Sequence, residues 1–192
     1  QRMFEAKENC FYYITTMTEN YVHPEMPAGA EEGIVQGMYL LEEVKAKKVA
    51  RKAAKKVQLM GSGTILNEVR AAAELLRDEF GISSDVWSLP SINQLTREGQ
   101  SCQRWNLLNP LEAAKVPYIT QQLTGHDGPV VAATDYLKAY SEQLRAFIPT
   151  EFFTLGTDGF GRSDTRAKLR DFFEVDRRYI VVAALYGLHK QG

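Results

Sequence analysis

The sequence has little of what several protein classes require. Its two cysteines, Cys10 and Cys102, lack the spacing of metal ligands, and no signal peptide precedes them. This disfavours a structural metal site, and we expect both to be buried or idle thiols in a reducing cytoplasm. No apolar run approaches the roughly 20 residues that a membrane span needs. The net charge of -1 argues against nucleic-acid or membrane partners, because both require a large cationic surface.

Recognisable catalytic constellations are also missing. The sequence shows no Ser/His/Asp order with supporting turns, no metal cluster and no carboxylate pair placed by helix spacing. Gly61-Ser62-Gly63 precedes a helix whose N–H groups could hold an anion, but it lacks the GxGxxG fingerprint and the Walker lysine. His23 and His126 have no second ligand nearby in the sequence, and we expect surface turns for them. We therefore predict no catalytic, cofactor-binding or metal-binding residue in this chain.

What the sequence does contain is an alternation of apolar, β-branched runs with amphipathic stretches. The former predict strands at 11–18, 34–43, 57–62, 85–90, 116–123 (an edge strand), 129–134 and 152–157. The latter predict helices at 66–80, 91–98, 135–147 and from the Ser163/Asp164 cap to a point before Asp176, with a polar segment at 99–110 packed over the sheet. In residues 179–188 the β-branched residues favour a strand, whereas the Asp176 cap and Ala183-Ala184 favour a buried helix, and we predict a helix at 177–190. We expect a three-layer α/β/α sandwich with a mixed, mostly parallel sheet of about five strands.

The start of the chain reads differently from the rest. The aromatic strand predicted at 11–18 has no earlier strand to pair with, and the chain opens at Gln1 without an initiator methionine. We therefore expect a piece of a longer protein: residues 1–22 would end a preceding domain, 23–33 would be a Pro/Gly-rich linker, and 34–192 would form the main domain. The lysine-rich run within 45–56 is predicted to be a solvated hairpin or short helix.

One strand–loop–helix unit gathers polar groups where ligands usually dock in open α/β sheets. The strand Phe152–Thr157 leads into a glycine-punctuated loop at 158–164, and a Ser/Asp cap starts the next helix. This loop is a candidate site for an anion or a partner, with Asp158, Arg162, Ser163, Asp164 and Arg166 as its residues. The alternative is that the arginines pair with Asp158 and Asp164 and only fix the shape of the loop.

Several motifs resemble, in order, the C-terminal part of homodimeric bacterial pyruvate dehydrogenases. The most specific are Leu155-Gly-Thr-Asp-Gly-Phe-Gly-Arg-Ser-Asp164 and Phe173-Glu-Val-Asp176. Others are Tyr12-Tyr-Ile-Thr-Thr16, Glu31-Glu-Gly33, Gly61-Ser-Gly63, Gly99-Gln-Ser-Cys102, Arg104-Trp-Asn106 and Val116-Pro-Tyr118. Transketolases share the fold and a looser Asp-x-Phe-Gly-x-Ser pattern, and they are the main alternative.

The resemblance implies that the main domain is transketolase-like and that residues 1–22 end a pyrimidine-binding domain. The parent enzyme would be a cytoplasmic homodimer that decarboxylates pyruvate on thiamine diphosphate and Mg²⁺. It would pass the acetyl group to the lipoyl arm of the dihydrolipoyl acetyltransferase component. This chain would be a non-catalytic dimerisation and support module without its own cofactor, and we expect a final helical tail to be missing. The alternatives are the C-terminal domain of a transketolase or another 2-oxo acid dehydrogenase, or a small regulatory anion-binding domain.

Overall fold

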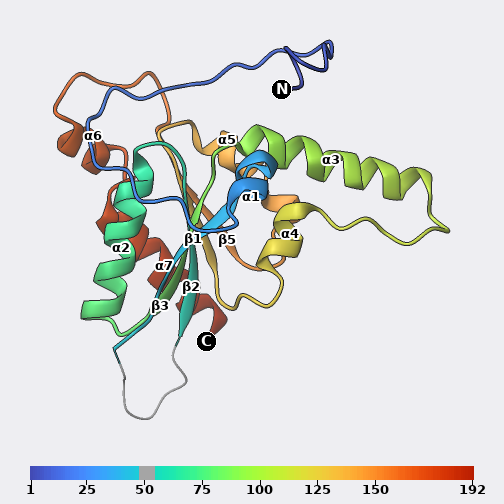
Figure 1. Ribbon diagram of the computed structural model, residues 1–192. Coiled ribbons are helices and arrows are strands. Elements are labelled where there is room, and N and C mark those ends of the chain that lie inside the picture. Colours follow the sequence, from blue (N-terminus) through green and yellow to red (C-terminus); the bar gives the residue numbers. More distant parts are fainter. Residues whose placement is uncertain (48–54) are drawn as a thin grey trace.

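A computed structural model of the protein describes residues 1–47 and 55–192, and its centre is a five-stranded sheet of order β1-β3-β2-β4-β5 (Figure 1). The strands are β1 (Tyr39–Val44), β2 (Lys56–Gly61), β3 (Ser83–Ser88), β4 (Val130–Ala133) and β5 (Phe152–Leu155). Strand β2 pairs in parallel with β3 and β4, β4 pairs in parallel with β5, and β1 joins β3 in the antiparallel sense. The predicted mixed, mostly parallel sheet is confirmed.

Helices cover both faces of this sheet. They are α1 (Glu31–Gln36), α2 (Ile65–Glu79), α3 (Ile92–Leu108), α4 (Tyr118–Leu123), α5 (Lys138–Glu142), α6 (Arg166–Phe172), α7 (Arg177–Gln191) and a short 3-10 helix, η1 (Arg145–Phe147). Figure 1 shows α2 and α7 on one side of the sheet and α3 and α4 on the other. Among the described residues, no helix has the length and apolar character needed to cross a bilayer.

Alternating strand residues divide the core into two halves. Leu59 of β2 and Val131 of β4 are buried in a cluster with α2 and α7, whereas Met60 and Ala132 are buried in a cluster with α3 and α4. Successive side chains of a strand point to opposite faces, so a buried two-sided sheet needs apolar residues at nearly every position. The three-layer α/β/α architecture follows from this pattern.

Two helices form as their sequence patterns predict. In α2, Val69, Ala72, Ala73 and Leu76 recur at three- and four-residue spacing and are buried, so one stripe of the helix packs on the sheet. The N-cap of helix α7 is Asp176, whose side chain accepts hydrogen bonds from the N–H groups of the first turn. The predictions for these helices are confirmed.

Helix α3 differs from the prediction that it ends near residue 98. It continues to Leu108 and includes most of the segment predicted to be irregular. A Cβ at Gly99 would lie 2.6 Å from the Phe147 ring, so this glycine permits close packing of α3 against η1 rather than breaking the helix. The helix predicted at 135–147 is also wrong in its extent, because α5 and η1 replace it.

The edge strand predicted at 116–123 is wrong. These residues form α4, and Pro117 precedes its first turn, where a missing N–H costs no helical hydrogen bond. The carboxylate of Glu98 accepts the backbone N–H of Tyr118 at 2.9 Å, which attaches α4 to α3. Tertiary contacts therefore override the β-branched, aromatic character of this segment.

The strand predicted at 34–43 is only partly confirmed. Its first residues belong to the short helix α1, and β1 begins at Tyr39 after the turn at Gly37. Of the lysine-rich run, residues 48–54 lie outside the described residues, while Lys56 is the first residue of β2.

The strand predicted at 11–18 is wrong as well. The segment is extended but pairs with no strand of the described residues, and the side chains of Phe11 and Tyr13 are 86% and 87% exposed. The segment then runs past α6, toward the carboxyl end of the sheet (Figure 1).

Candidate functional site

The candidate site is a crevice at the carboxyl ends of the parallel strands. Thr64, Asp135 and Thr157 follow β2, β4 and β5 and line a cavity of about 360 Å³. From β2 the chain crosses to β3 on one side, and the next parallel strand, β4, lies on the other side of β2. The two following loops diverge at such a switch point and leave a crevice between them. Ser62 and Thr134 join the two strands at its base through their hydroxyls, 2.8 Å apart.

Two separate parts of the chain cover this crevice. Met17, Thr18 and Glu19 of the N-terminal segment line it on one side. On the other side lie the loop after β5, the helix α6 and the turn that follows it. They contribute Gly161, Arg162, Arg166, Leu169, Arg170, Phe173 and Val175. The cavity therefore has both guanidinium groups and apolar side chains in its wall.

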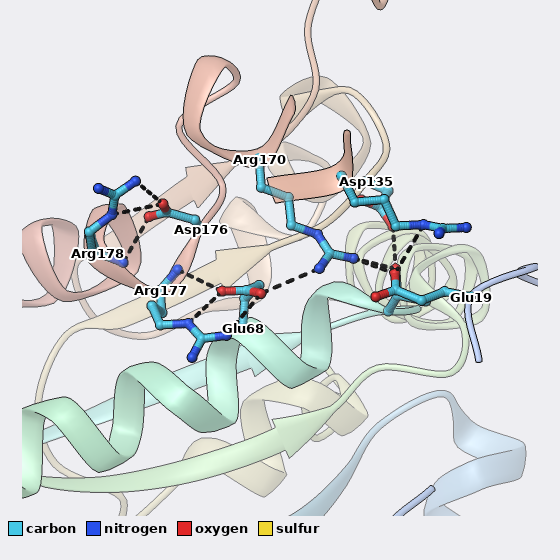
Figure 2. A network of polar contacts seen from close by, with 9 residues as sticks. Glu19, Glu68, Asp135, Arg170, Asp176, Arg177 and Arg178 are labelled. Atoms are coloured by element: carbon cyan, nitrogen blue, oxygen red, sulfur yellow. Dashed lines mark hydrogen bonds and ion pairs between the residues drawn. The ribbon is translucent and has the colours of Figure 1, made fainter. Parts of the chain in front are cut away.

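A network of ion pairs holds these parts together (Figure 2). Glu68 of α2 accepts hydrogen bonds from the backbone N of Arg177 at 3.1 Å and from its Nε at 2.9 Å. It also lies 3.4 Å from Nη1 of Arg170, whose Nη2 donates to Glu19 at 2.5 Å. Four segments distant in sequence, namely the N-terminal segment, α2, α6 and the start of α7, therefore meet at two carboxylates.

Burial acts with different outcomes on the pKa of Asp135, which lines the crevice, and on that of Glu68, which contacts the lining residue Arg170. For Glu68, burial alone would raise the pKa, but hydrogen bonds from Arg177 and the charge of Arg170 outweigh it, so its pKa is lowered. For Asp135, burial prevails over the hydrogen bond from Thr64 at 3.0 Å and raises the pKa. Glu68 is therefore a charged carboxylate whose role is to bind Arg177 and Arg170. Asp135 takes up a proton more readily than an ordinary aspartate.

The predicted loop residues are only partly brought together. All three of Arg162, Ser163 and Arg166 are exposed to solvent, but only the two arginines line the cavity. Asp158 accepts the backbone N–H of Lys138 at 2.9 Å, and Asp164 accepts that of Thr165 at 2.7 Å. The predicted pairing of the two arginines with these aspartates is wrong.

The arginines have other partners instead. The guanidinium of Arg162 stacks over the ring of Phe172, 4.1 Å from its centroid, and Nε of Arg166 lies 3.5 Å from Glu19. The expected cap on Ser163 or Asp164 is also absent, because α6 begins after Thr165 without a side-chain cap bond. Asp158 and Asp164 each accept a hydrogen bond from a backbone N–H and not from an arginine. Arg162 and Arg166 therefore do not pair with these aspartates and line the crevice instead.

Sequence reasoning missed several residues of the crevice. Thr64 and Asp135 are polar residues that come two or three positions after the buried strands β2 and β4. Ligands of open α/β sheets bind at the carboxyl ends of the strands, so examining the residues after every predicted strand would have identified both. Arg170 lies four residues after Arg166, so the helical spacing of α6 places both on one face. Glu19 carries no local signal, since it lies 151 residues away from Arg170 in sequence.

A second polar cluster lies near the opposite end of the sheet. The buried carboxylate of Asp85 contacts Lys56 Nζ and His126 Nδ1, both at 2.7 Å. His126 was expected to be exposed, but its side chain is only 24% exposed and its ring packs edge-on against Trp87, so that prediction is wrong. We interpret this cluster as structural, because it ties the turn before β4 to β2 and β3.

The crevice does not fit a metal-bound diphosphate cofactor. Among residues 1–47 and 55–192, no three His, Cys, Asp or Glu side chains are grouped so that they could hold a metal ion. Mg²⁺ is usually held by carboxylates together with phosphate oxygens, and here the nearby carboxylates already serve Arg170, Arg177 and Thr64.

Comparisons with known proteins agree over the whole chain. The family model for "Transketolase-like TK C-terminal domain" matches residues 37–176, and that for "Pyruvate dehydrogenase E1 component middle domain" matches residues 1–24. The chain is 56% identical over 193 residues to the pyruvate dehydrogenase E1 component of Pseudomonas aeruginosa, and 53% identical over 194 residues to that of Escherichia coli K12. Each alignment covers 100% of this chain and 21% of the relative.

A solved structure shares the fold at much lower sequence identity. The transketolase from Leishmania mexicana aligns with a TM-score of 0.50 and 19% identity, over 83% of this chain and 19% of that chain. The pyruvate dehydrogenase relatives described above are much longer than this chain, which spans about a fifth of their length, at 21%.

Proposed function

Because the chain belongs to the transketolase-like TK C-terminal domain family, we propose that it is the C-terminal support domain of a pyruvate dehydrogenase E1 component. The observation that carries this proposal is an identity of 56% and 53% to two such components along the whole chain. The match of residues 1–24 to the middle domain of the same enzyme supports it. Residues 1–22 then end the pyrimidine-binding domain, 23–33 are the linker, and 34–192 form the C-terminal domain.

The parent enzyme of this proposal decarboxylates pyruvate on thiamine diphosphate and Mg²⁺. It transfers the acetyl group to the lipoyl arm of a dihydrolipoyl acetyltransferase, and it acts as a cytoplasmic homodimer. This domain contributes no catalytic residue and no cofactor ligand. Its role is to stabilise the dimer, and the loop after β5 offers a surface for a partner.

The ion-pair network supports a role in holding domains together. Glu19, within the part that matches the middle domain, is bound by Arg170 of α6 at 2.5 Å. Thr15 of the same segment bonds the hydroxyl of Tyr136 at 3.0 Å. These contacts fix the end of one domain on the crevice of the next, as a support domain requires.

The test compares the 192-residue chain with the full-length protein in a pyruvate-dependent dye-reduction assay and in calorimetric titration with thiamine diphosphate and Mg²⁺. We expect turnover and cofactor binding by the full-length protein and neither by the chain alone. Turnover by the chain, or a full-length protein inactive toward pyruvate, would refute the proposal. A truncated form of the parent protein, from which residues 34–192 are deleted, should dissociate into monomers at concentrations where the intact protein is dimeric.

A transketolase parent is the alternative. It shares the fold, but the identity to the Leishmania mexicana transketolase is 19%, against 56% to a pyruvate dehydrogenase component. The same full-length protein assayed with a ketose phosphate donor and an aldose acceptor separates the two. Ketol transfer without pyruvate decarboxylation would favour the transketolase.

A further inference from the structure

The crevice has the size and the mixed lining of a small-molecule site. Its volume of about 360 Å³ lies within the roughly 300–1,000 Å³ of typical ligand pockets. Leu169, Phe173 and Val175 contribute apolar groups to its lining, and Arg162 and Arg166 contribute cationic groups. A ligand that matches both kinds of group needs an anionic group and an apolar part.

The charged residues that line the crevice leave a positive charge that a ligand could neutralise. Three guanidinium groups and two carboxylates line the cavity, which is a surplus of one positive charge. Arg170 is engaged by Glu19 at 2.5 Å and by Glu68 at 3.4 Å. Within residues 1–47 and 55–192, the polar contacts of Arg166 are long, 3.5 Å to Glu19 and 3.5 Å to Thr18. A guanidinium has five N–H donors, so Arg166 retains the capacity to bind a carboxylate.

The second arginine is held in place without using its donors. The Cζ atom of Arg162 lies over the ring of Phe172, 4.1 Å from its centroid. A cation–π contact uses none of the five N–H donors of a guanidinium, so these remain able to donate. Arg162 and Arg166 thus both contribute hydrogen-bond donors to the lining of the crevice.

Asp135 on the opposite wall does not cancel this charge fully. It faces the hydroxyl of Thr64, the residue before α2, together with Arg166 and Arg170 of α6 and Glu19 of the N-terminal segment. Burial raises the pKa of Asp135, so its carboxyl repels an incoming anion less than an ordinary aspartate would.

We propose that this crevice binds a small organic carboxylate, whose anionic group is held by Arg166 and Arg162 and whose apolar part packs on Leu169 and Phe173. The proposed site shares Arg162 and Arg166 with the candidate loop of the sequence analysis and does not use Asp158, Ser163 and Asp164 as ligand-binding groups. The site is independent of the parent's reaction. Its absence would leave the family membership and the proposed function intact.

The first experiment titrates the chain with acetate, butyrate, benzoate and inorganic phosphate by calorimetry, with amide chemical shifts as a second readout. We expect saturable binding that strengthens from acetate to benzoate, with phosphate weaker than benzoate. Shift changes should be largest around Arg166 and Thr64. Lack of saturable binding by every carboxylate overturns the proposal, and so does tighter binding of phosphate than of benzoate.

Matched variants then locate the site. Arg166→Gln should weaken benzoate binding at least tenfold, because it removes a charge-assisted hydrogen bond worth on the order of a tenfold or larger change in affinity. Lys168→Gln, on the same helix with a side chain that is 75% exposed, should leave binding unchanged. Asp135→Asn should strengthen binding and flatten its dependence on pH, because the remaining repulsion disappears while the Thr64 hydroxyl keeps an acceptor. Equal affinity of Arg166→Gln and the parent chain, at equal melting temperature, refutes the assignment.

Discussion

Glu68 is the residue whose replacement tests the packing of this domain most directly. Its side chain is only 9% exposed, and it accepts three hydrogen bonds from Arg177 and one from Arg170. Glu68→Gln keeps the shape and one carbonyl oxygen but removes the charge. Breaking a buried ion pair costs about 3–5 kcal/mol. The Arg177 side chain is 49% exposed and its contribution is screened, so we expect a loss of about 2 kcal/mol.

The assay is chemical and thermal unfolding of the chain, followed by circular dichroism. In a protein of this size about 2 kcal/mol corresponds to a melting temperature lower by roughly 4–8 °C. Glu74→Gln is the matched control, because Glu74 lies on the same helix and is exposed, and it should change stability by less than about 0.5 kcal/mol. Equal losses in the two variants would refute the role assigned to Glu68.

The pH dependence of the same pair gives an independent check. The pKa of Glu68 is lowered in the folded chain, so the unfolded chain binds the proton more tightly. The stabilisation by Glu68 is therefore fully present above the ordinary glutamate pKa and is lost as the pH falls through the folded pKa. The difference between the parent chain and Glu68→Gln should shrink on acidification. A difference that stays constant into the acidic range contradicts the argument.

Two further predictions concern a thiol and a turn. Cys102 is 8% exposed and burial raises its pKa to about 11, so at pH 8 a thiol reagent should modify Cys10 promptly and Cys102 only after denaturation; equal rates would contradict this. Gly128→Ala should cost at least about 3 kcal/mol in unfolding experiments, because φ is +96° and a Cβ would lie 1.9 Å from the Lys56 carbonyl. Gly125→Ala, at φ +85° in open space, should cost only about 1–2 kcal/mol, and similar losses would contradict the clash.

Local sequence patterns predicted the central part of the fold. The buried strands β2, β3, β4 and β5 and the helices α2 and α7 follow from apolar spacing and caps such as Asp176, which act within a few residues. The segment at 116–123 shows the limit of this reasoning. Its aromatic and β-branched residues favour a strand, but Tyr118 donates its hydroxyl to the Met38 carbonyl at 3.1 Å and its N–H to Glu98. Contacts over 80 and 20 residues decide the outcome.

The candidate site, like the fold, could be predicted from the sequence only in part. The strand–loop–helix unit after β5 led to Arg162 and Arg166, which do line the crevice. The pairing of the loop could not be predicted, because Asp158 takes its partner, the Lys138 N–H, from 20 residues away. The position of Glu19 also depends on the complete fold, since only the folded sheet brings the N-terminal segment to α6.

The geometry of Glu19 also determines what an anion in the crevice would do to the attachment of the N-terminal segment. Glu19 is 2.5 Å from Arg170 but 3.5 Å from Arg166, so its strong bond is to the arginine that Glu68 also holds. A carboxylate ligand would take Arg166 away from a weak contact and leave the bond to Arg170 in place. Binding in the crevice is therefore compatible with an N-terminal segment that stays attached to α6. An anion that released the N-terminal segment would instead have to displace Glu19 from Arg170, at the cost of an ion pair whose arginine side chain is only 14% exposed.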